Sequence, residues 1–420
     1  MPIVSLAGLL GQPDVTAFLR GIVARGRYGN AYLFTGPAGV GKGTAALAFA
    51  RAALCDHVHG AAPAAATVTA ADDGMSLFGG MGSAPAAPEP AAPAPDGPLL
   101  DDACGECPAC RKSASLQHPD LKFLFPVSGV EAKLEETIGE TLQGMRDDPL
   151  FVFQYDQAAS VRLSLTRELQ RELAFRPYEA SRRVVIIRDC DRMREDQYSA
   201  LLKSIEEPGA STLWVLTSSR LSRVPATIRS RCQTVKFAPL PETAVETVLQ
   251  QYGKASGPLA RTLAALAAGS LARAVALSRE DAAGQARAAL AMLEPVRARN
   301  QAGLWKAAQD ATKFGRAGRE ALRRTIEFHQ LWQRDLLSAR YGDGSRPFVF
   351  AEREAEIRAE AARTDATEIR RRLMVLEEAL RSIDGNITAD LTLFSALARV
   401  GGAKLGEGAW PSHGTARWDY

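Results

Sequence analysis

Apolar residues along this chain recur with two different periods, and the change between them divides the sequence. Short continuous apolar runs at 31–34, 184–187 and 213–217 alternate with segments whose apolar residues have helical spacing. Such runs are typical of strands buried on both faces. A further strand is expected at 119–125, and helices are expected at 44–54, 133–145, 164–177 and around 201–205. Strands that alternate with helices predict a parallel sheet covered on both faces, so residues 1–238 are expected to form an α/β domain.

Beyond Pro239 the pattern is helical throughout. Residues 239–283 are expected to form a compact bundle of short helices, and residues 284–402 longer amphipathic helices with charged outer faces. Helices of this kind usually pack in a bundle or against partner subunits. The apolar positions expected to pack in these two regions are Leu259, Leu263 and Leu266 in the first and Leu373, Leu376 and Leu380 in the second.

Two segments have compositions that do not support a packed core. Residues 60–98 are dominated by Ala, Pro and Gly, and contain few large apolar side chains. Such a segment cannot bury enough surface to offset the entropy of ordering it, so a disordered insertion is expected. The tail 403–420 is rich in Gly and small residues and is expected to be loosely ordered.

Length and charge set only broad bounds on function. The 420 residues suffice for two or three domains, and the net charge of +3 is too small to argue for nucleic-acid binding by itself. No apolar run approaches the length of about 20 residues that spans a bilayer, and the N-terminus lacks the pattern of a secretion signal. We therefore expect a cytoplasmic protein with no membrane partner, in which cysteines stay reduced.

The cysteines have the spacing of metal ligands. Cys104, Cys107 and Cys110 form a C-x₂-C-x₂-C run, and Cys55 lies at the end of the helix expected at 44–54. Four thiolates complete a closed tetrahedral Zn²⁺ site, which would be structural because no coordination position remains open. An iron–sulfur cluster uses similar spacing, but nothing else in the sequence suggests electron transfer.

A glycine-rich loop predicts a phosphate-binding site. Residues 36–42, Gly-Pro-Ala-Gly-Val-Gly-Lys, lie between the strand at 31–34 and the following helix, which is the order of a P-loop. Backbone N–H groups of such a loop and the helix N-terminus bind phosphate oxygens. The residues expected to contact nucleotide here are Gly36, Gly39, Gly41, Lys42, Gly43 and Thr44.

The catalytic half of this site departs from the hydrolysing pattern. Gly43 directly follows Lys42, at the position where a Ser or Thr hydroxyl would ligate Mg²⁺. The hydroxyl of Thr44 lies one position further along the chain. The strand at 184–187 ends in Arg188 and Asp189, so a cation stands where the first acid belongs. These residues predict a degenerate Walker B element, with ATP or ADP bound without efficient hydrolysis. The alternative is a shifted element in which Asp189 binds metal and Asp191 compensates.

Several motifs occur together in one order and carry a family resemblance. They are the run 31–36, the cysteine trio, Ala-Leu-Leu-Lys-Ser-Ile-Glu-Glu-Pro at 200–208 and Ile-Arg-Ser-Arg-Cys at 228–232. In this combination the chain resembles bacterial clamp-loader subunits of the AAA+ superfamily over nearly its whole length. The resemblance implies a RecA-like α/β domain bearing zinc, a small helical lid and an all-α C-terminal collar. It also implies a hetero-pentameric ring that opens a sliding clamp and places it on primed DNA.

The resemblance also implies roles for three residues outside the loop. Arg231 of the Ser-Arg-Cys triplet is the arginine that related subunits project into a neighbour's ATP site. Thr217, at the end of the strand at 213–217, takes the place of the first sensor, and Arg273 resembles the sensor arginine of the lid. From the residues alone, Arg231 could instead pair with a surface acid, and Arg229 or Arg223 could take its place as the finger.

Three competing functions remain open at this point. An ATP-hydrolysing motor subunit of the same ring is the main alternative to a stator that lends Arg231. A P-loop kinase would match residues 41–44 but would not explain the cysteines or the helical C-terminal region. Direct DNA binding would use basic positions, and the candidates are Arg182, Arg183 and Arg192.

Overall fold

The chain forms two compact units, Met1–Pro239 and Leu240–Tyr420. The computed structural model describes residues 5–59, 100–127, 133–153, 155, 159–206, 211–312, 315–342, 347–383 and 388–403. The insertion expected at 60–98 lies outside the described residues, as does the expected tail after Ala403.

The first unit is built on a five-stranded parallel sheet, which confirms the expected α/β class. The strands lie in the order β2-β3-β4-β1-β5. Their bounds are Ala31–Thr35 for β1, Leu121–Leu124 for β2, Arg183–Ile187 for β3, Thr212–Ser218 for β4 and Gln233–Lys236 for β5. Because β4 lies between β1 and β3, the carboxyl end of β4 separates the glycine loop after β1 from the acidic turn after β3.

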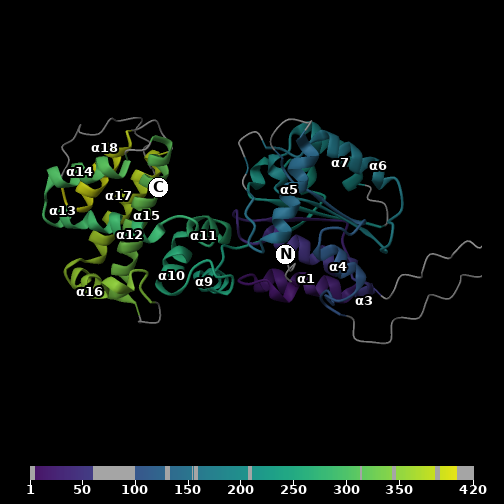
Figure 1. The fold of residues 1–420 in the computed structure, drawn as a ribbon, viewed down its shortest axis with the longest axis horizontal. Coiled ribbons are helices and arrows are strands. Elements are labelled where there is room, and N and C mark those ends of the chain that lie inside the picture. Colours follow the sequence, from purple (N-terminus) through teal and green to yellow (C-terminus); the bar gives the residue numbers. More distant parts are fainter. Residues whose placement is uncertain are drawn as a thin grey trace, which may run out of the picture. The chain divides into compact units, whose positions relative to one another are not determined.

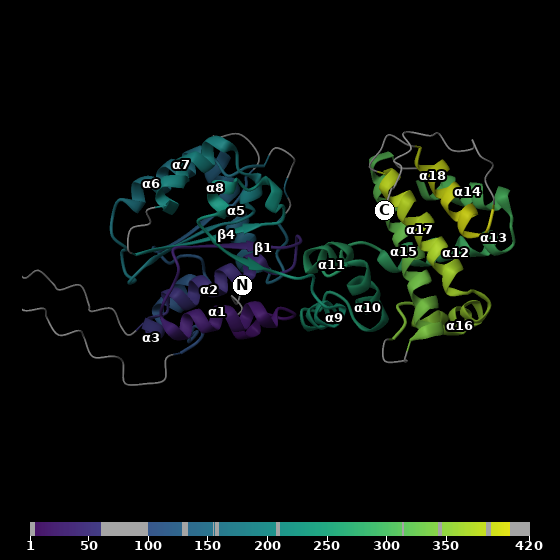
Figure 2. The same ribbon diagram turned by 180° about the vertical axis from the view of Figure 1, so that it is seen from behind.

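Helices cover both faces of this sheet (Figures 1 and 2). On one face lie α1 (Pro13–Arg25), α2 (Lys42–Leu54), α3 (Asp56–His59) and α4 (Pro108–Ala114). On the other lie α5 (Leu134–Asp147), α6 (Leu163–Leu173), α7 (Glu195–Glu206) and α8 (Ala226–Arg229). The α6 and α7 side chains Leu169 and Leu201 pack with Trp214 of β4 in one buried cluster. Among the described residues of this unit there are also short 3₁₀ helices, η1 (Leu6–Gly8), η3 (Cys190–Arg192) and η4 (Leu221–Arg223).

Two buried charged side chains, Arg183 and Asp120, fix the loop between α6 and β3. As a result α6 ends earlier than expected. The helix stops at Leu173 and does not continue to Pro177. The guanidinium of Arg183, which is almost fully buried, donates to the carbonyl oxygens of Glu172 at 2.7 Å and Arg176 at 3.2 Å. The buried carboxylate of Asp120 accepts the backbone N–H groups of residues 178–180 at 2.7–2.9 Å. These bonds satisfy backbone groups that a longer helix would have used.

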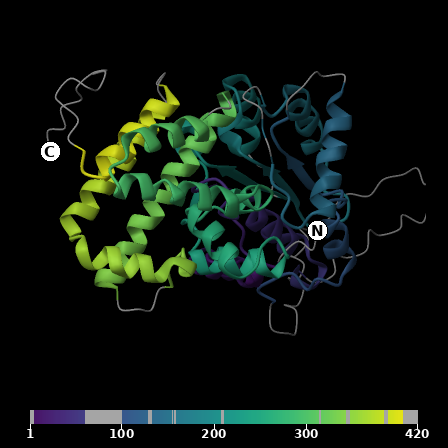
Figure 3. The same cartoon turned by 60° about the vertical axis from the view of Figure 1, so that its left-hand side comes forward.

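The second unit is helical throughout the described residues, as the sequence predicts (Figure 3, green to yellow). Its helices are α9 (Glu242–Gln251), α10 (Gly257–Leu266), α11 (Leu271–Ser278), α12 (Ala282–Ala291), α13 (Leu293–Arg297), α14 (Gln301–Thr312), α15 (Gly315–Tyr341), η5 (Ala351–Arg353), α16 (Glu354–Arg363), α17 (Ala366–Ile383) and α18 (Ala389–Val400). Leu263, Leu266 and Leu376 are buried, whereas Leu259 is exposed, so the expectation that Leu259 packs in the core was wrong. Leu259 lies in the first turn of α10, whose buried residues begin at Ala260.

Contacts within this unit join its first helices to α15. Arg334 of α15 lies 2.7 Å from Glu242 of α9, and Arg324 lies 3.0 Å from Glu280, which follows α11. The division of the unit into a lid at 239–283 and a collar at 284–402 remains a prediction. In the part of the chain that the structure describes, no helix is long and apolar enough to cross a membrane.

Candidate functional site

The glycine loop lies at the carboxyl end of β1, where parallel sheets of this type bind ligands. Gly36 has φ 149°, and a Cβ there would overlap the carbonyl oxygen of Phe237, so the position requires glycine. Gly39 and Gly41 also have positive φ, and Gly41 is the N-cap of α2. The loop therefore turns its backbone toward the N-terminus of α2, as phosphate binding requires.

Lys42 is buried inside this loop. Its ammonium group donates to the carbonyl oxygens of Gly36 at 2.8 Å and Pro37 at 2.5 Å, and to the Ser219 hydroxyl at 3.1 Å. Burial lowers the pKa of Lys42 to about 8. Ser219, just after β4, is a member of this site that sequence reasoning missed, because a lone serine after a strand carries no specific signal.

The turn after β3 is bonded to the end of β4. The backbone N–H of Asp189 donates to the Thr217 hydroxyl at 2.9 Å, and the Asp191 carboxylate accepts the Ser219 N–H at 3.0 Å. Thr217 and Asp191 are both buried. The structure thus brings the predicted residues Thr217, Asp189 and Asp191 together beside the glycine loop. The Thr217 hydroxyl stabilises the turn after β3 by accepting the Asp189 N–H.

Arg188 points from β3 to the start of α2. A Cβ built on Gly43 would overlap the Nη1 atom of Arg188, so the guanidinium fills the space that a side chain at position 43 would take. Its Nε donates to the Tyr155 hydroxyl at 3.2 Å and lies 3.3 Å from the Asp189 carboxylate. Thr44, in the first turn of α2, is half-buried.

Phe153 and Tyr155 also contact Arg188. The Arg188 guanidinium carbon lies 3.9 Å from the centre of the Phe153 ring, a cation–π contact. Neither aromatic residue was singled out from the sequence. Both lie in an irregular segment more than thirty residues from Arg188, where no periodic pattern or motif marks them.

The four predicted metal-ligating cysteines converge. The sulfurs of Cys55, Cys104, Cys107 and Cys110 all lie within 4.8 Å of one another. The Cys55–Cys107 and Cys104–Cys110 sulfur pairs are each 3.9 Å apart. A tetrahedral Zn²⁺ with bonds of about 2.3 Å would place its sulfurs about 3.8 Å apart, so the geometry fits this ion.

Backbone N–H groups point at three of these sulfurs. Cys104 N donates to Cys55 Sγ, Cys107 N to Cys104 Sγ and Cys110 N to Cys107 Sγ, at 3.4–3.5 Å. Hydrogen bonds of this kind stabilise thiolates. A hydrogen bond with the Cys110 thiol also lowers the pKa of Cys55. Because Cys55 is the C-cap of α2, the cluster anchors the end of the same helix whose start forms the P-loop.

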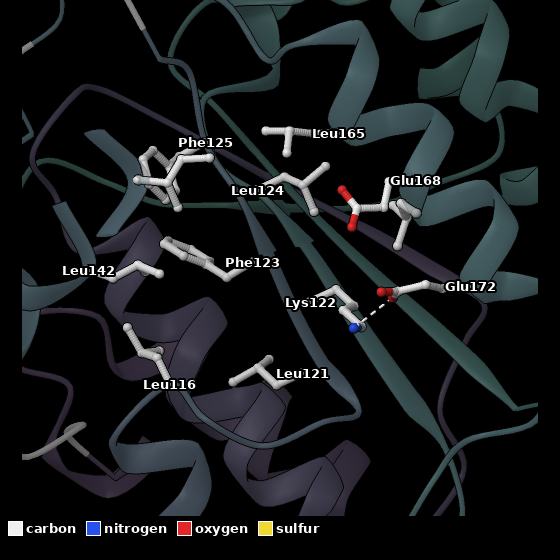
Figure 4. Close-up of a pocket in the computed structure, with 12 residues that line it drawn as sticks. Leu116, Leu121, Lys122, Phe123, Leu124, Phe125, Leu142, Leu165, Glu168 and Glu172 are labelled. Atoms are coloured by element: carbon white, nitrogen blue, oxygen red, sulfur yellow. Dashed lines mark ion pairs between the residues drawn. The ribbon is translucent and has the colours of Figure 1, made fainter. Parts of the chain in front are cut away.

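A separate apolar cavity of about 220 Å³ lies between β2, α5 and α6 (Figure 4). Its wall includes Leu116, Phe123, Leu142 and Leu165, and its one ion pair joins Lys122 to Glu172 at 2.6 Å. None of its lining residues belongs to the glycine loop, so the cavity is separate from that site.

Comparisons with known proteins agree with the geometry. A family model described as "DNA polymerase III, delta subunit" matches residues 11–70 and 93–241. The DNA polymerase III subunit delta' of Bacillus subtilis is 25% identical over 376 residues, covering 90% of this chain and 92% of that protein. The chain belongs to the delta prime-like clamp-loader proteins.

Other relatives of the delta prime-like chain match over shorter lengths. The delta' subunit of Pseudomonas aeruginosa is 30% identical over 52% of this chain and 46% of that protein, and Bacillus subtilis subunit tau is 24% identical over 56% of this chain and 30% of that protein. A solved gamma subunit-related structure from Thermotoga maritima is 17% identical and covers 70% of this chain and 97% of that chain, with a TM-score of 0.33.

Arg231 of the delta prime-like chain is exposed and paired within its own chain. It follows α8, and its Nε lies 2.8 Å from the Glu206 carboxylate at the end of α7. Its Nη1 donates to the Thr227 carbonyl oxygen at 2.9 Å. The surface-acid pairing considered from the sequence is therefore present in the single chain, and the role of Arg231 in a neighbour's site remains a prediction.

Arg273 belongs to the second unit of the delta prime-like chain. It lies on α11, and its Nη2 is 2.5 Å from the Glu327 carboxylate of α15. Its expected contact with nucleotide remains a prediction.

The three arginines considered for direct DNA contact are engaged inside the delta prime-like chain. Arg183 is buried, so it cannot reach a phosphate, and the structure removes it from the candidates for DNA contact. Arg182 lies 4.0 Å from the centre of the Tyr28 ring, and Arg192 lies 4.8 Å from that of Tyr155.

Proposed function

We propose that this delta prime-like chain acts in the bacterial cytoplasm as the stator of a hetero-pentameric clamp-loader ring. Its partners would be subunits of the gamma/tau and delta types, and a subunit tau is among the proteins that this chain matches. The ring would place a sliding clamp on primed DNA. Within the ring the chain would lend Arg231 to a neighbour's ATP site and would not hydrolyse ATP efficiently itself.

The contact of Arg188 with Gly43 carries this proposal. P-loop ATPases hold Mg²⁺ with the Ser or Thr after the loop lysine and with a Walker B acid. This chain has neither group, and a guanidinium fills the space between their positions. The shifted alternative, in which Asp189 binds the metal, is disfavoured because the Asp189 carboxylate already faces the Arg188 cation at 3.3 Å. The same contact between Asp189 and Arg188 disfavours an ATP-hydrolysing motor subunit, because such a subunit needs an acid that binds the metal.

The exposure of Arg231 supports its proposed role as a finger in trans. Its side chain is 39% exposed and its Glu206 partner 34% exposed. Exposed ion pairs of this kind contribute only about 0–1 kcal/mol. A neighbour's triphosphate could therefore displace Glu206 at little cost, and a guanidinium beside the γ-phosphate accelerates phosphoryl transfer by about 10³–10⁵.

Two cofactors belong to this proposal. The four cysteines would hold a structural Zn²⁺, which keeps α2 and α4 together. The glycine loop would hold ATP or ADP as a resident ligand, which would make the first unit a rigid body against which neighbouring subunits move.

Reconstitution tests the proposal. We would assemble the ring from this chain, its candidate partner subunits and the clamp, and measure DNA-stimulated ATP turnover and clamp loading. Omitting the chain should abolish loading, and Arg231→Ala should depress turnover. Arg229→Ala is the matched control, because Arg229 is also exposed and lies two residues away. A loss caused by Arg229→Ala and not by Arg231→Ala would move the finger to Arg229, and unchanged turnover with both would remove it.

A further inference from the structure

Gly43 and Arg188 form an interlocked pair at the place where a P-loop protein keeps its metal ion. In hydrolysing relatives of the fold, a hydroxyl at the first position and an acid at the second would meet at Mg²⁺. Here a side chain on residue 43 would overlap Arg188 Nη1. Loss of the hydroxyl thus provides the room that the guanidinium takes, and the two departures form one structural feature.

Three side chains contact the Arg188 cation. Phe153 stacks on it at 3.9 Å, the Tyr155 hydroxyl accepts from Nε at 3.2 Å, and the Asp189 carboxylate lies 3.3 Å away. Its side chain is only 25% exposed. A guanidinium held in this way has its terminal N–H groups directed at α2 and does not sample many rotamers.

The side-chain charges around the loop balance, and its backbone adds the positive potential that favours an anion. Lys42 and Arg188 supply two cations, and the acids near them are Asp189 and Asp191. Asp191 is bonded to the Ser219 N–H and Asp189 faces Arg188, so both carboxylates already have partners. The loop N–H groups and the N-terminus of α2 add positive potential.

We propose that Arg188 takes the place of the divalent cation, so that this P-loop binds the phosphates of ADP or ATP without Mg²⁺. The inference deepens the resident-nucleotide part of the proposed function and rests on it. A guanidinium offers paired N–H donors to phosphate oxygens, as a metal offers coordination. It does not coordinate or activate water, so the ligand stays intact. Since Arg188 fills the metal position, Mg²⁺ on the nucleotide should hinder binding.

The test is calorimetric titration of the full, zinc-loaded chain with ADP and with ATP. One series uses buffer freed of divalent ions beforehand, with no chelator present that could strip the cysteines, and the other contains excess MgCl₂. The wild-type chain should bind at least about tenfold more tightly without Mg²⁺. Arg188→Met should lose the metal-free binding, whereas Arg192→Met, which removes a neighbouring stacked arginine, should keep it.

A double variant reverses the preference. Gly43→Ser with Arg188→Asp restores the hydroxyl and the acid, and its nucleotide binding should require Mg²⁺. Thermal denaturation and zinc content show whether each variant is folded. The proposal is overturned if wild-type binding requires Mg²⁺, if neither nucleotide binds under either condition, or if folded Arg188→Met binds as tightly as wild type without the metal.

Clamp loading separates this inference from the proposed function. A chain that supports Arg231-dependent loading but binds no nucleotide without Mg²⁺ would refute the inference and leave the stator intact. A chain that binds nucleotide without Mg²⁺ but cannot support loading would refute the stator and leave the inference intact.

Discussion

The guanidinium of Arg231 lies 2.8 Å from the carboxylate of Glu206, and both side chains are partly open to solvent. This pair joins the segment after α8 to the end of α7. In the proposed ring the same guanidinium contacts a neighbour's triphosphate, so Glu206 competes with that ligand for Arg231.

Glu206→Gln should therefore leave stability nearly unchanged, with a difference below about 1 kcal/mol, and leave ring ATP turnover equal or higher. Thermal denaturation and the reconstituted ATPase assay measure the two effects. Glu195→Gln, which removes an acid from the other end of α7, is the control. A loss of turnover as large as that of Arg231→Ala would show that Glu206 orients the finger and does not compete with its ligand.

The glycine loop depends on close approach at Gly36. Gly36→Ala should destabilise the chain by about 2 kcal/mol or more, because the new Cβ would meet the Phe237 carbonyl oxygen at a backbone φ that alanine disfavours. Gly139→Ala is the matched control, and its expected effect on the free energy of unfolding has the opposite sign. Gly139 lies in α5 with nothing near its Cβ position, so alanine there should stabilise by about 0.5–1 kcal/mol. Chemical denaturation measures both changes, and an equally stable Gly36→Ala chain would contradict the loop geometry.

The sequence predicted the buried strands β1, β3 and β4 because they are continuous apolar runs, whereas β5, whose side chains are mostly exposed, was not expected. The runs at 184–187 and 213–217 became β3 and β4 with one or two added residues. What it could not predict are contacts between distant, non-periodic positions. Arg183 lies in a basic cluster that resembles a solvated face, yet it is buried because its guanidinium donates to the carbonyl oxygens of Glu172 and Arg176.

The same limit applies to the site. The glycine loop and the cysteines follow known spacings, so their residues could be named beforehand. That Gly43 and Arg188 are two parts of one contact became visible only when β3 and α2 were placed side by side. The Glu206 partner of Arg231 depended likewise on where α7 ends.

Protein purified without added metal should contain close to one zinc per chain. Cys107→Ser should lose it, since structural zinc sites contribute about 10–16 kcal/mol of apparent binding energy in small peptides. Because Cys55 ends α2, the loss should also lower the melting temperature of the first unit. Cys232→Ser, at a cysteine outside the cluster, should keep its zinc. Elemental analysis decides, and full zinc occupancy in Cys107→Ser would count against the assignment.

The buried Lys42 should leave a signature in the pH dependence of stability. Its pKa is about 8 in the folded chain, against 10.5 for an ordinary lysine, and burial is the main cause. Between these two values the unfolded chain binds more protons, so this residue's contribution to stability rises with pH from about 8 to 10.5. The gain is of order 3 kcal/mol, since each pKa unit corresponds to about 1.4 kcal/mol.

Lys42→Met removes this titration. The unfolding free energy of wild type minus that of Lys42→Met should therefore increase as pH rises from about 8 to 10.5. A difference that stays constant would show that Lys42 keeps an ordinary pKa.

The most direct test of the central claim combines the reconstituted ring with the isolated chain. If the chain lends an arginine and does not break down its own nucleotide, Arg231→Ala will depress DNA-stimulated ATP turnover by the ring, and the isolated wild-type chain will hydrolyse ATP no faster than the isolated Lys42→Ala chain. Ring turnover retained on Arg231→Ala, together with faster hydrolysis by the isolated wild-type chain than by Lys42→Ala, would contradict the account.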